Sequence, residues 1–197
     1  VAGKIAIVVG AGQTPGVSIG NGRATAVILG REGAKVVAAD RNLESAEETA
    51  KMIRDEGGDA IAIAVDATSE EDLGKLVQAT IAHYGGLNIL HNNVGASVGA
   101  QDKNPLEMTE EAFDRVVAMN FKSAWFASKH AIPHMREHGG GSIINISSMA
   151  ARHAYPYLGY KTTKTALLAL TEQLAACIPT RPGSSPASRC MWTVRRT

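Results

Sequence analysis

The chain has 197 residues, of which 45% are apolar and 20% are charged, proportions typical of a soluble globular protein. Its formal net charge is +1, so the overall composition gives no basis for a nucleic-acid partner. No apolar run reaches the roughly 18 residues that a membrane-spanning helix needs, and two cysteines are too few for a disulfide scaffold. We therefore expect a cytoplasmic protein that interacts with neither membranes nor nucleic acid.

Short apolar runs rich in Val and Ile alternate along the chain with longer segments of helical periodicity. Strands are predicted at residues 5–9, 35–39, 60–65, 87–90 and 142–146. Helices are predicted at residues 22–32, 43–56, 69–84, 109–137 and 157–177, with Pro133 expected to kink or end the fourth. Five successive strand–helix units predict an α/β fold: a single domain, residues 1–177, built on a doubly wound parallel sheet of the Rossmann type.

Residues 178–197 break this alternation. They contain three prolines and four arginines, with no acidic residue and no strand-length apolar run. This composition predicts an irregular basic tail. Basic tails can bind nucleic acid or acidic lipid, but the interpretation we favour is a solvated chain end.

A glycine-rich loop follows the first predicted strand, in VVGAGQTPGVSIGNGRATA (residues 8–26). Its glycines are Gly10, Gly12, Gly16, Gly20 and Gly22, a longer spacing than the G-x-G-x-x-G of dinucleotide-binding proteins. N–H groups at a helix start can hold a pyrophosphate, and glycine lets the backbone approach it closely. We predict a phosphate-binding turn with an extended loop, in which Gly10, Gly12 and Gly20 bind the cofactor. Ser18 and Ile19 are expected to make contacts that a shorter turn would make itself.

The ends of the next three strands lie on the ligand-binding edge of such a sheet. Asp40 ends the second strand, where a carboxylate can bond the ribose hydroxyls of the cofactor adenosine. This carboxylate would repel a 2′-phosphate and so favours NAD over NADP, whereas the adjacent Arg41 could accommodate the phosphate. Asp66 ends the third strand, and Asn92-Asn93-Val94-Gly95 follows the fourth.

Tyr160 and Lys164 stand four residues apart, so both project from one face of a predicted helix. A lysine ammonium beside a phenol stabilises the phenolate, which makes the tyrosine a usable acid and base nearer neutral pH. Ser148, just past the fifth predicted strand, could donate a hydrogen bond to a substrate oxygen.

Between Lys4 and about Ala176 the chain resembles the short-chain dehydrogenase/reductase family. The matching features, in chain order, are the glycine loop, Asp40, Asp66, N92-N93-V94-G95, Asn120 in VVAMNF, the INISS run that ends at Ser148, and Tyr160-K-T-T-Lys164. The resemblance implies an NAD(P)-dependent oxidoreductase that interconverts a hydroxyl and a carbonyl on a small alcohol or ketone. It also implies a homo-oligomer, either a dimer or a tetramer. We expect no metal site.

The same resemblance implies a role for each matching residue. Tyr160 would exchange a proton with the substrate oxygen, Lys164 would also bond the nicotinamide ribose, and Ser148 would polarise the carbonyl. Ser147 is the competing serine, but the second serine of the run usually carries this role in the family. Asn120 would hold a water in a proton relay. The remaining cofactor contacts would come from Asp66, facing the adenine, and from Ala67, Asn93 and Gly95.

Two features lean towards enoyl-thioester reductases, a divergent branch of the same superfamily. Tyr157 stands seven residues before Lys164, and Gly12, Ser18 and Gly22 fit that branch's G-x5-S-x3-G loop. The motif after the fourth strand, together with the active-site asparagine and serine, resembles the carbonyl and alcohol branch instead. We favour carbonyl chemistry and keep reduction of a C=C bond as the alternative.

The resemblance ends near residue 176. Family members usually continue into a sixth strand, a substrate loop and a seventh strand, which residues 178–197 do not resemble. We therefore expect a C-terminally truncated or atypical member of the family. A second alternative follows, in which the chain is an inactive remnant that binds NAD or forms oligomers without turnover.

Overall fold

The fold is described from a computed structural model, for residues 1–13, 16 and 18–177. The predicted basic tail, residues 178–197, lies outside the described residues, so that prediction stays untested.

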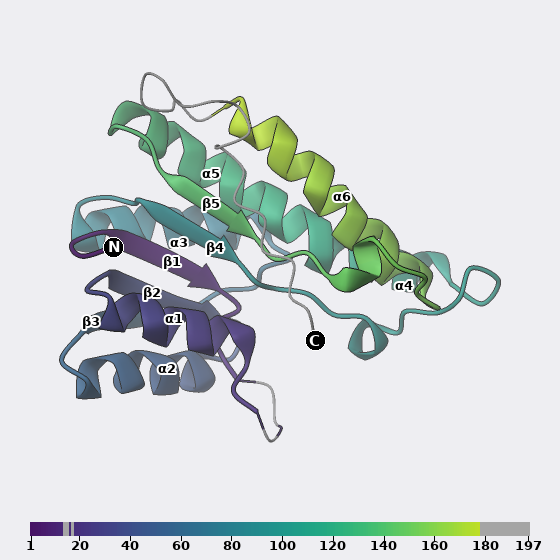
Figure 1. Ribbon diagram of the computed structural model, residues 1–197, viewed down its shortest axis with the longest axis horizontal. Helices are drawn as coiled ribbons and strands as arrows, with labels where there is room; N and C mark the ends of the chain where they lie inside the picture. Colours follow the sequence, from purple (N-terminus) through teal and green to yellow (C-terminus); the bar gives the residue numbers. More distant parts are fainter. Residues whose placement is uncertain (14–15, 17, 178–197) are drawn as a thin grey trace.

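Five parallel strands form one sheet in the order β3-β2-β1-β4-β5 (Figure 1). They are β1 Ile5–Val9, β2 Lys35–Asp40, β3 Asp59–Ala64, β4 Ile89–Asn92 and β5 Ser142–Asn145. The chain runs outwards from β1 on one side through β2 and β3, then crosses back to β4 on the other side. The doubly wound Rossmann-type prediction is therefore confirmed, and the switch point between β1 and β4 is where such sheets bind ligands.

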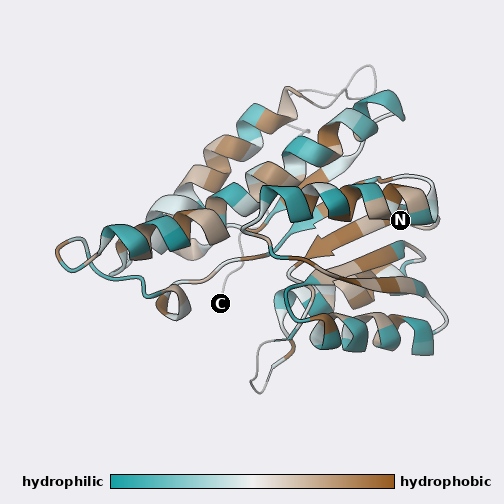
Figure 2. Ribbon diagram, turned by 180° about the vertical axis from the view of Figure 1, so that it is seen from behind, coloured by the Kyte–Doolittle hydropathy of each residue, from teal (hydrophilic) through white to brown (hydrophobic). Residues whose placement is uncertain are grey.

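Helices cover both faces of this sheet (Figures 1 and 2). Helices α1 (Asn21–Arg31) and α2 (Leu43–Asp55) pack on one face through a buried cluster that includes Val27 and Ile53. Helices α3 (Glu70–Tyr84) and α5 (Ser123–Glu137) pack on the other through Leu73 and Met135. Helix α6 (Leu158–Ala175) lies beside α5. Because both faces are covered, the strands read as nearly continuous apolar runs.

The strand predicted at 87–90 is displaced by two residues, to Ile89–Asn92. Pairing continues to the end of the sheet, where Asn92 lies opposite Val9 of β1 and Asn145 of β5. A buried polar chain extends this pairing: the Asn92 amide donates to Asn145 Oδ1 at 2.8 Å, and the Asn145 amide donates to Thr171 Oγ1 of α6 at 2.9 Å. These hydrogen bonds give both buried asparagine amide groups an acceptor, whereas Asn92 Oδ1 has no hydrogen-bond partner among the described residues.

The prediction of one regular helix over residues 109–137 is wrong, because the helical segment is interrupted. The structure divides it into α4 (Glu110–Val117), a π-helical turn (Ala118–Lys122) and α5. The helix does not end at Pro133, because α5 continues to Glu137. Pro133 lies on the exposed side of α5, where water can bond the carbonyl that proline leaves without a helical N–H donor.

Helix α1 starts directly above the end of β1. Gly10 directly follows that strand and has a φ of +82°, a conformation that glycine adopts readily. Gly22, in the first turn of α1, packs so close that a β-carbon there would lie 1.8 Å from the Gly10 carbonyl oxygen. Only glycine at position 22 permits this contact between strand and helix.

We predict that Gly22→Ala lowers the free energy of unfolding by about 3 kcal/mol, because the methyl group would force strand and helix apart. The measurement is urea denaturation followed by circular dichroism. Gly99→Ala is the control, since a β-carbon at Gly99 has no neighbour within 4 Å. Equal stability of the two variants would contradict the assigned contact.

Candidate active site

Asp40 and the glycine loop, both predicted to bind the cofactor, lie in direct contact. The Asp40 carboxylate accepts hydrogen bonds from the Gly12 N–H at 2.9 Å and from the Asn42 N–H at 3.1 Å. A β-carbon at Gly12 would lie 2.7 Å from the Asp40 carboxyl carbon. The glycine loop therefore packs against the Asp40 carboxylate at the end of β2, and the close approach requires glycine at position 12.

The extended loop is closed by Gln13, which the sequence analysis did not single out. Its side-chain amide donates to the Ser18 carbonyl at 2.9 Å and accepts from the Gly20 N–H at 2.7 Å. The Gln13 N–H donates to Ser45 Oγ of α2 at 2.7 Å. Gln13 thus brackets the second half of the loop, while Ile19 projects into solvent. No local sequence pattern identifies Gln13, because its hydrogen-bond partners come within reach only when the loop is folded.

Asp66 lies just past β3 on the same edge of the sheet. Its Oδ1 accepts from the Thr68 hydroxyl at 2.7 Å and from the Thr68 N–H at 2.8 Å. These bonds, the hydroxyl's above all, lower the pKa of Asp66, and the charge of Arg41 acts in the same direction. Asp66 is therefore held ionised and oriented, with Ala67 buried next to it.

The turn after β4 connects the cofactor side to the candidate catalytic side. Asn93 donates from its side-chain amide to the Gly10 carbonyl at 3.1 Å. Two residues on, a β-carbon at Gly95 would lie 2.7 Å from Lys164 Nζ. The predicted cofactor residues Asn93 and Gly95 thus lie between the glycine loop and the lysine of α6.

Asn120 is completely buried in the π-helical turn. Its Oδ1 accepts from the Ala96 N–H at 2.7 Å, and its amide donates to the Ala96 carbonyl at 2.9 Å and to Thr163 Oγ1 at 3.2 Å. The asparagine therefore ties the turn after β4 to α6, one helical turn from Tyr160. A role in holding a water stays a prediction.

Lys164 is the buried charge at the centre of the site, with 2% of its surface exposed. Its ammonium donates to the Ile146 carbonyl at 2.8 Å and to the Val94 carbonyl at 3.4 Å. The nitrogen lies 5.7 Å from the centre of the Tyr160 ring. Burial lowers the pKa of Lys164 to about 8.

The competing tyrosine–lysine pair is not assembled in the same way. Lys161 donates instead to the carbonyls of Ala150 and His153, at 3.1 and 2.6 Å. Tyr157 precedes the first turn of α6 and lines a cavity together with residues of the loop after β4. The geometry thus favours Tyr160 as the partner of Lys164.

The two serines after β5 have different partners. The Ser147 hydroxyl is buried and donates to the Lys164 carbonyl at 2.7 Å. Ser148 caps a short 3-10 helix (Met149–Ala151) by accepting from the Ala150 N–H at 3.2 Å. Among the described residues, the Ser148 hydroxyl donates no hydrogen bond, so its proton is available to a substrate oxygen.

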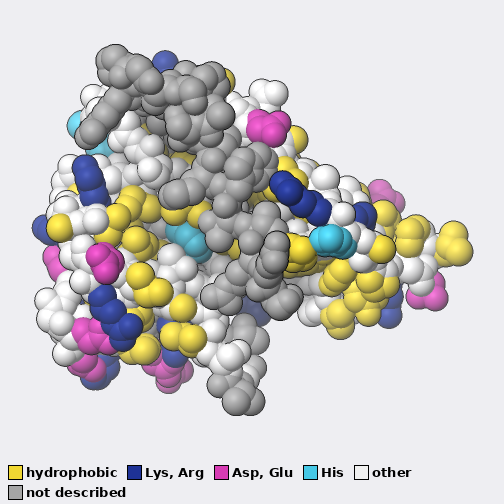
Figure 3. Space-filling view, in the orientation of Figure 1, with side chains coloured by type: hydrophobic (Ala, Val, Ile, Leu, Met, Phe, Trp, Pro, Cys, Tyr) yellow, Lys and Arg dark blue, Asp and Glu magenta, His cyan; other side chains and the backbone are white. Residues whose placement is uncertain are grey.

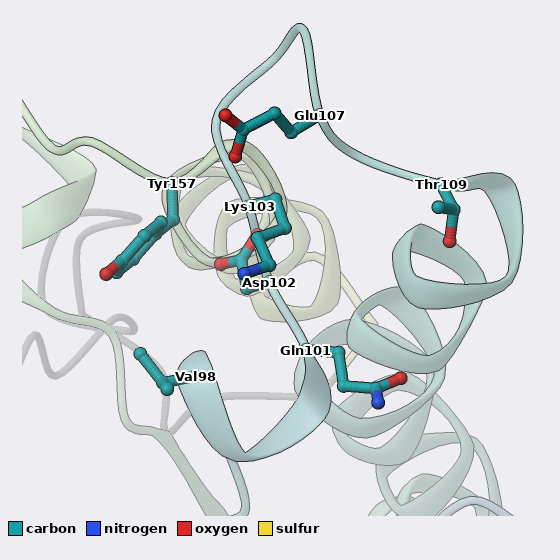
Figure 4. Close-up of a pocket in the computed structure, with 7 residues that line it drawn as sticks. All are labelled: Val98, Gln101, Asp102, Lys103, Glu107, Thr109 and Tyr157. Atoms are coloured by element: carbon teal, nitrogen blue, oxygen red, sulfur yellow. The ribbon is translucent and has the colours of Figure 1, made fainter.

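A cavity of about 370 Å³ lies beside the loop after β4 (Figure 4). It is lined by Val98, Gln101, Asp102, Lys103, Glu107, Thr109 and Tyr157. Neither Tyr160 nor Ser148 belongs to this lining, so the cavity is not where the reacting atoms would sit. Hydrophobic side chains gather on the tapered end of the molecule formed by this loop (Figure 3), where Leu106 is 97% exposed.

Within residues 1–13, 16 and 18–177, no cluster of His, Cys, Asp and Glu has the arrangement of a metal site. No helix in that part of the chain combines the length and apolar character needed to cross a bilayer.

Comparisons with known proteins agree with this geometry. The family model described as short chain dehydrogenase matches residues 4–181. An uncharacterized oxidoreductase of Thermotoga maritima is 37% identical over 88% of the chain, and versicolorin reductase 1 of Aspergillus parasiticus is 41% identical over 76%. A 7α-hydroxysteroid dehydrogenase, solved with NADH and 7-oxo glycochenodeoxycholic acid, superimposes with a TM-score of 0.81 at 30% identity over 98% of the chain.

The chain belongs to the short-chain dehydrogenase/reductase family of oxidoreductases, whose members use NAD or NADP. It spans less than the full length of these relatives: 65% of the Thermotoga protein, 53% of versicolorin reductase 1 and 68% of the hydroxysteroid dehydrogenase chain.

The buried ammonium of Lys164 leads to a prediction of how the free energy of unfolding depends on pH. The pKa of Lys164 is about 8 in the folded chain, against about 10.4 for an unfolded lysine. Between these values the unfolded chain binds the extra proton, so stability rises with pH there. We predict that the free energy of unfolding of the wild type rises by ~3 kcal/mol relative to that of Lys164→Met between pH 7 and pH 11. This rise does not depend on how much the two proteins differ in stability at pH 7.

The measurement is the free energy of unfolding of both proteins in urea at several pH values. Lys161→Met provides the control: Lys161 lies on the same helix, and because this variant keeps Lys164, its stability should rise with pH as that of the wild type does. A constant difference between wild type and Lys164→Met across this range would refute the depressed pKa.

Proposed function

We propose that the chain is an NAD(P)-dependent oxidoreductase that interconverts a hydroxyl and a carbonyl on a small organic substrate. The observation that carries the proposal is the buried Lys164 ammonium, held by the Ile146 carbonyl and facing the Tyr160 ring. A buried positive charge beside a phenol favours the phenolate and so prepares the tyrosine for proton transfer. The hydroxysteroid dehydrogenase with its bound NADH and 7-oxo substrate supports the same chemistry by similarity.

The residues at the carboxyl edge of the sheet fit a dinucleotide. Gly12 and Gly22 leave no side chain above the end of β1, and Asp40 stands where it can receive ribose hydroxyls once the loop is in place. Asp66, with its orientation fixed by Thr68, would bond the adenine. The bound nicotinamide would supply or accept the hydride.

The chain's own residues would handle the proton and the substrate oxygen. In reduction, Tyr160 donates its phenolic proton to the oxygen that becomes the hydroxyl, and in oxidation it takes that proton back. Lys164 stabilises the phenolate left between these steps. Ser148, whose hydroxyl hydrogen is uncommitted among the described residues, donates a hydrogen bond to the same oxygen.

We predict that Tyr160→Phe lowers kcat by a factor of ~10³ or more, because the general acid and base is lost. Cofactor affinity should change little. Nicotinamide absorbance at 340 nm measures turnover over a panel of alcohols and ketones, and fluorescence titration measures NAD(H) binding. Tyr157→Phe is the matched control and should retain turnover; loss of turnover in Tyr157→Phe alone would transfer the role to that residue.

Cofactor choice depends on the carboxylate at the end of β2. We propose NAD as the preferred cofactor, since the Asp40 carboxylate would repel a 2′-phosphate. Asp40→Asn removes this charge while keeping the side chain's size. We expect the ratio of NADP to NAD dissociation constants to fall at least about tenfold, which corresponds to ~1.4 kcal/mol. An unchanged ratio in fluorescence titrations would remove Asp40 from this role.

Two other outcomes of the same assays correspond to the remaining hypotheses. Turnover with enones or enoyl thioesters, but not with ketones, would indicate reduction of a C=C bond, the chemistry that the loop spacing alone suggests. Cofactor binding without hydride transfer across the panel would indicate a nucleotide-binding remnant. A dimeric or tetrameric state and a cytoplasmic location stay predictions.

A further inference from the structure

Helix α6, which carries Tyr160, has no cap of its own. The residue at its N-cap position, Tyr157, makes no capping hydrogen bond with its side chain. Helices α2, α3 and α4 each begin with a local cap, from Asn42, Ser69 and Thr109 respectively. The first N–H groups of a helix have no partner within the helix, so those of α6 need one from elsewhere.

The loop after β4 supplies hydrogen-bond acceptors for the N–H groups of the first three residues of α6. The Leu158 N–H donates to the Lys103 carbonyl at 2.8 Å. The Gly159 N–H donates to Asp102 Oδ1, and the Tyr160 N–H to Asp102 Oδ2, both at 2.8 Å. Both oxygens of one carboxylate thus bind consecutive N–H groups 57 and 58 residues further along the chain. Charge-assisted hydrogen bonds to a helix N-terminus are strong and directional.

Asp102 is buried, with 2% of its surface exposed, and the backbone before it is strained. Gln101 has a φ of +64°, the one positive value for a residue other than glycine among those described. Such a conformation costs energy and persists only where the surrounding contacts require it. Here it directs the next side chain onto the start of α6.

A second connection from Asp102 leads to the Tyr160 ring. The Ser97 hydroxyl donates to Asp102 Oδ2 at 3.1 Å, and the Tyr155 hydroxyl donates to Ser97 Oγ at 3.4 Å. The Tyr155 ring lies 5.5 Å from the Tyr160 ring, centre to centre. The carboxylate therefore contacts the backbone of Tyr160 and, through two hydroxyls, the aromatic ring beside it.

We propose that Asp102 is a positioning residue, which holds Tyr160 in place and makes its position depend on the conformation of the loop after β4. The proposal rests on the function assigned above to Tyr160. It assigns no proton transfer to Asp102. A movement of the loop would release two N–H groups at once and displace the phenol from Lys164.

The test replaces the carboxylate without changing its size. In Asp102→Asn the amide nitrogen cannot accept a hydrogen bond, so one of the two N–H groups loses its partner. We expect kcat to fall tenfold to a hundredfold, on the order of the loss caused by a small misplacement of a reacting group. NAD(H) affinity should stay within twofold, and Asp102→Ala should lose at least as much kcat as Asp102→Asn. Unchanged kcat in both variants would overturn the proposal.

A matched control separates positioning from general stability. Ser69→Ala removes the cap of α3, where Ser69 Oγ accepts from the Asp72 N–H, and should lower Tm without changing kcat per folded molecule. A second pair of variants leaves the carboxylate intact. Gln101→Val places a β-branched residue at a positive φ and should reproduce the loss in Asp102→Asn, whereas Gln101→Gly tolerates that φ and should retain kcat. Equal kcat in Gln101→Val and Gln101→Gly would contradict the proposed strain.

A readout that needs no turnover keeps this test apart from the proposed function. The chain is labelled with 3-fluorotyrosine, and the Tyr160 signal is assigned by its loss in Tyr160→Phe. We expect Asp102→Asn to shift or broaden that ¹⁹F signal and to speed deuterium exchange at the start of α6, with neither change in Ser69→Ala. If the wild type transfers no hydride, the proposed function fails. These two measurements would still show whether Asp102 holds the start of α6 and Tyr160 in place. An unmoved ¹⁹F signal with unchanged exchange refutes it.

Discussion

A buried ammonium needs acceptors, and the site is arranged around that requirement. Charged groups are costly to remove from water unless they are paired or hydrogen-bonded. Lys164 meets this condition with the Ile146 and Val94 carbonyls, which follow β5 and β4 in neighbouring positions of the sheet. The lysine thereby joins α6 to the carboxyl edge, and the absence of a side chain at Gly95 leaves room for it. One nitrogen on α6 thus contacts the chain just past the ends of two neighbouring strands.

Periodicity and motif spacing predicted most of the fold. The strand–helix alternation led to the correct sheet class, because buried parallel strands are apolar on both faces and are easily distinguished from amphipathic helices. The proximity of Lys164 to the Tyr160 ring is also what the four-residue spacing indicated. Tyr160 and Lys164 are brought together by the local geometry of one helix, which spacing in the sequence is enough to show.

Other features depend on partners that a local pattern cannot show. The Asp102 carboxylate binds N–H groups 57 and 58 residues away, and a single aspartate in a polar loop has no signature for that role. Gln13 is similar, since its acceptors and donors come together only when the loop is folded. Of the two effects expected of Pro133, a kink or an end, the helix end does not occur, since α5 continues to Glu137 with Pro133 on its exposed side, a position that the proline itself does not reveal.

The π-helical turn at Ala118–Lys122 has a consequence for how this segment can change in evolution. A π turn contains one residue more than the α-helix it interrupts. Because the extra residue is accommodated within the turn, deleting one residue there would restore regular helix, with α4 and α5 keeping their present faces and the residues of the turn displaced. Asn120 would then turn away from Ala96 and Thr163, its present partners. The segment can therefore accept substitutions at its outer positions, but its length is constrained by the orientation that one buried amide must keep.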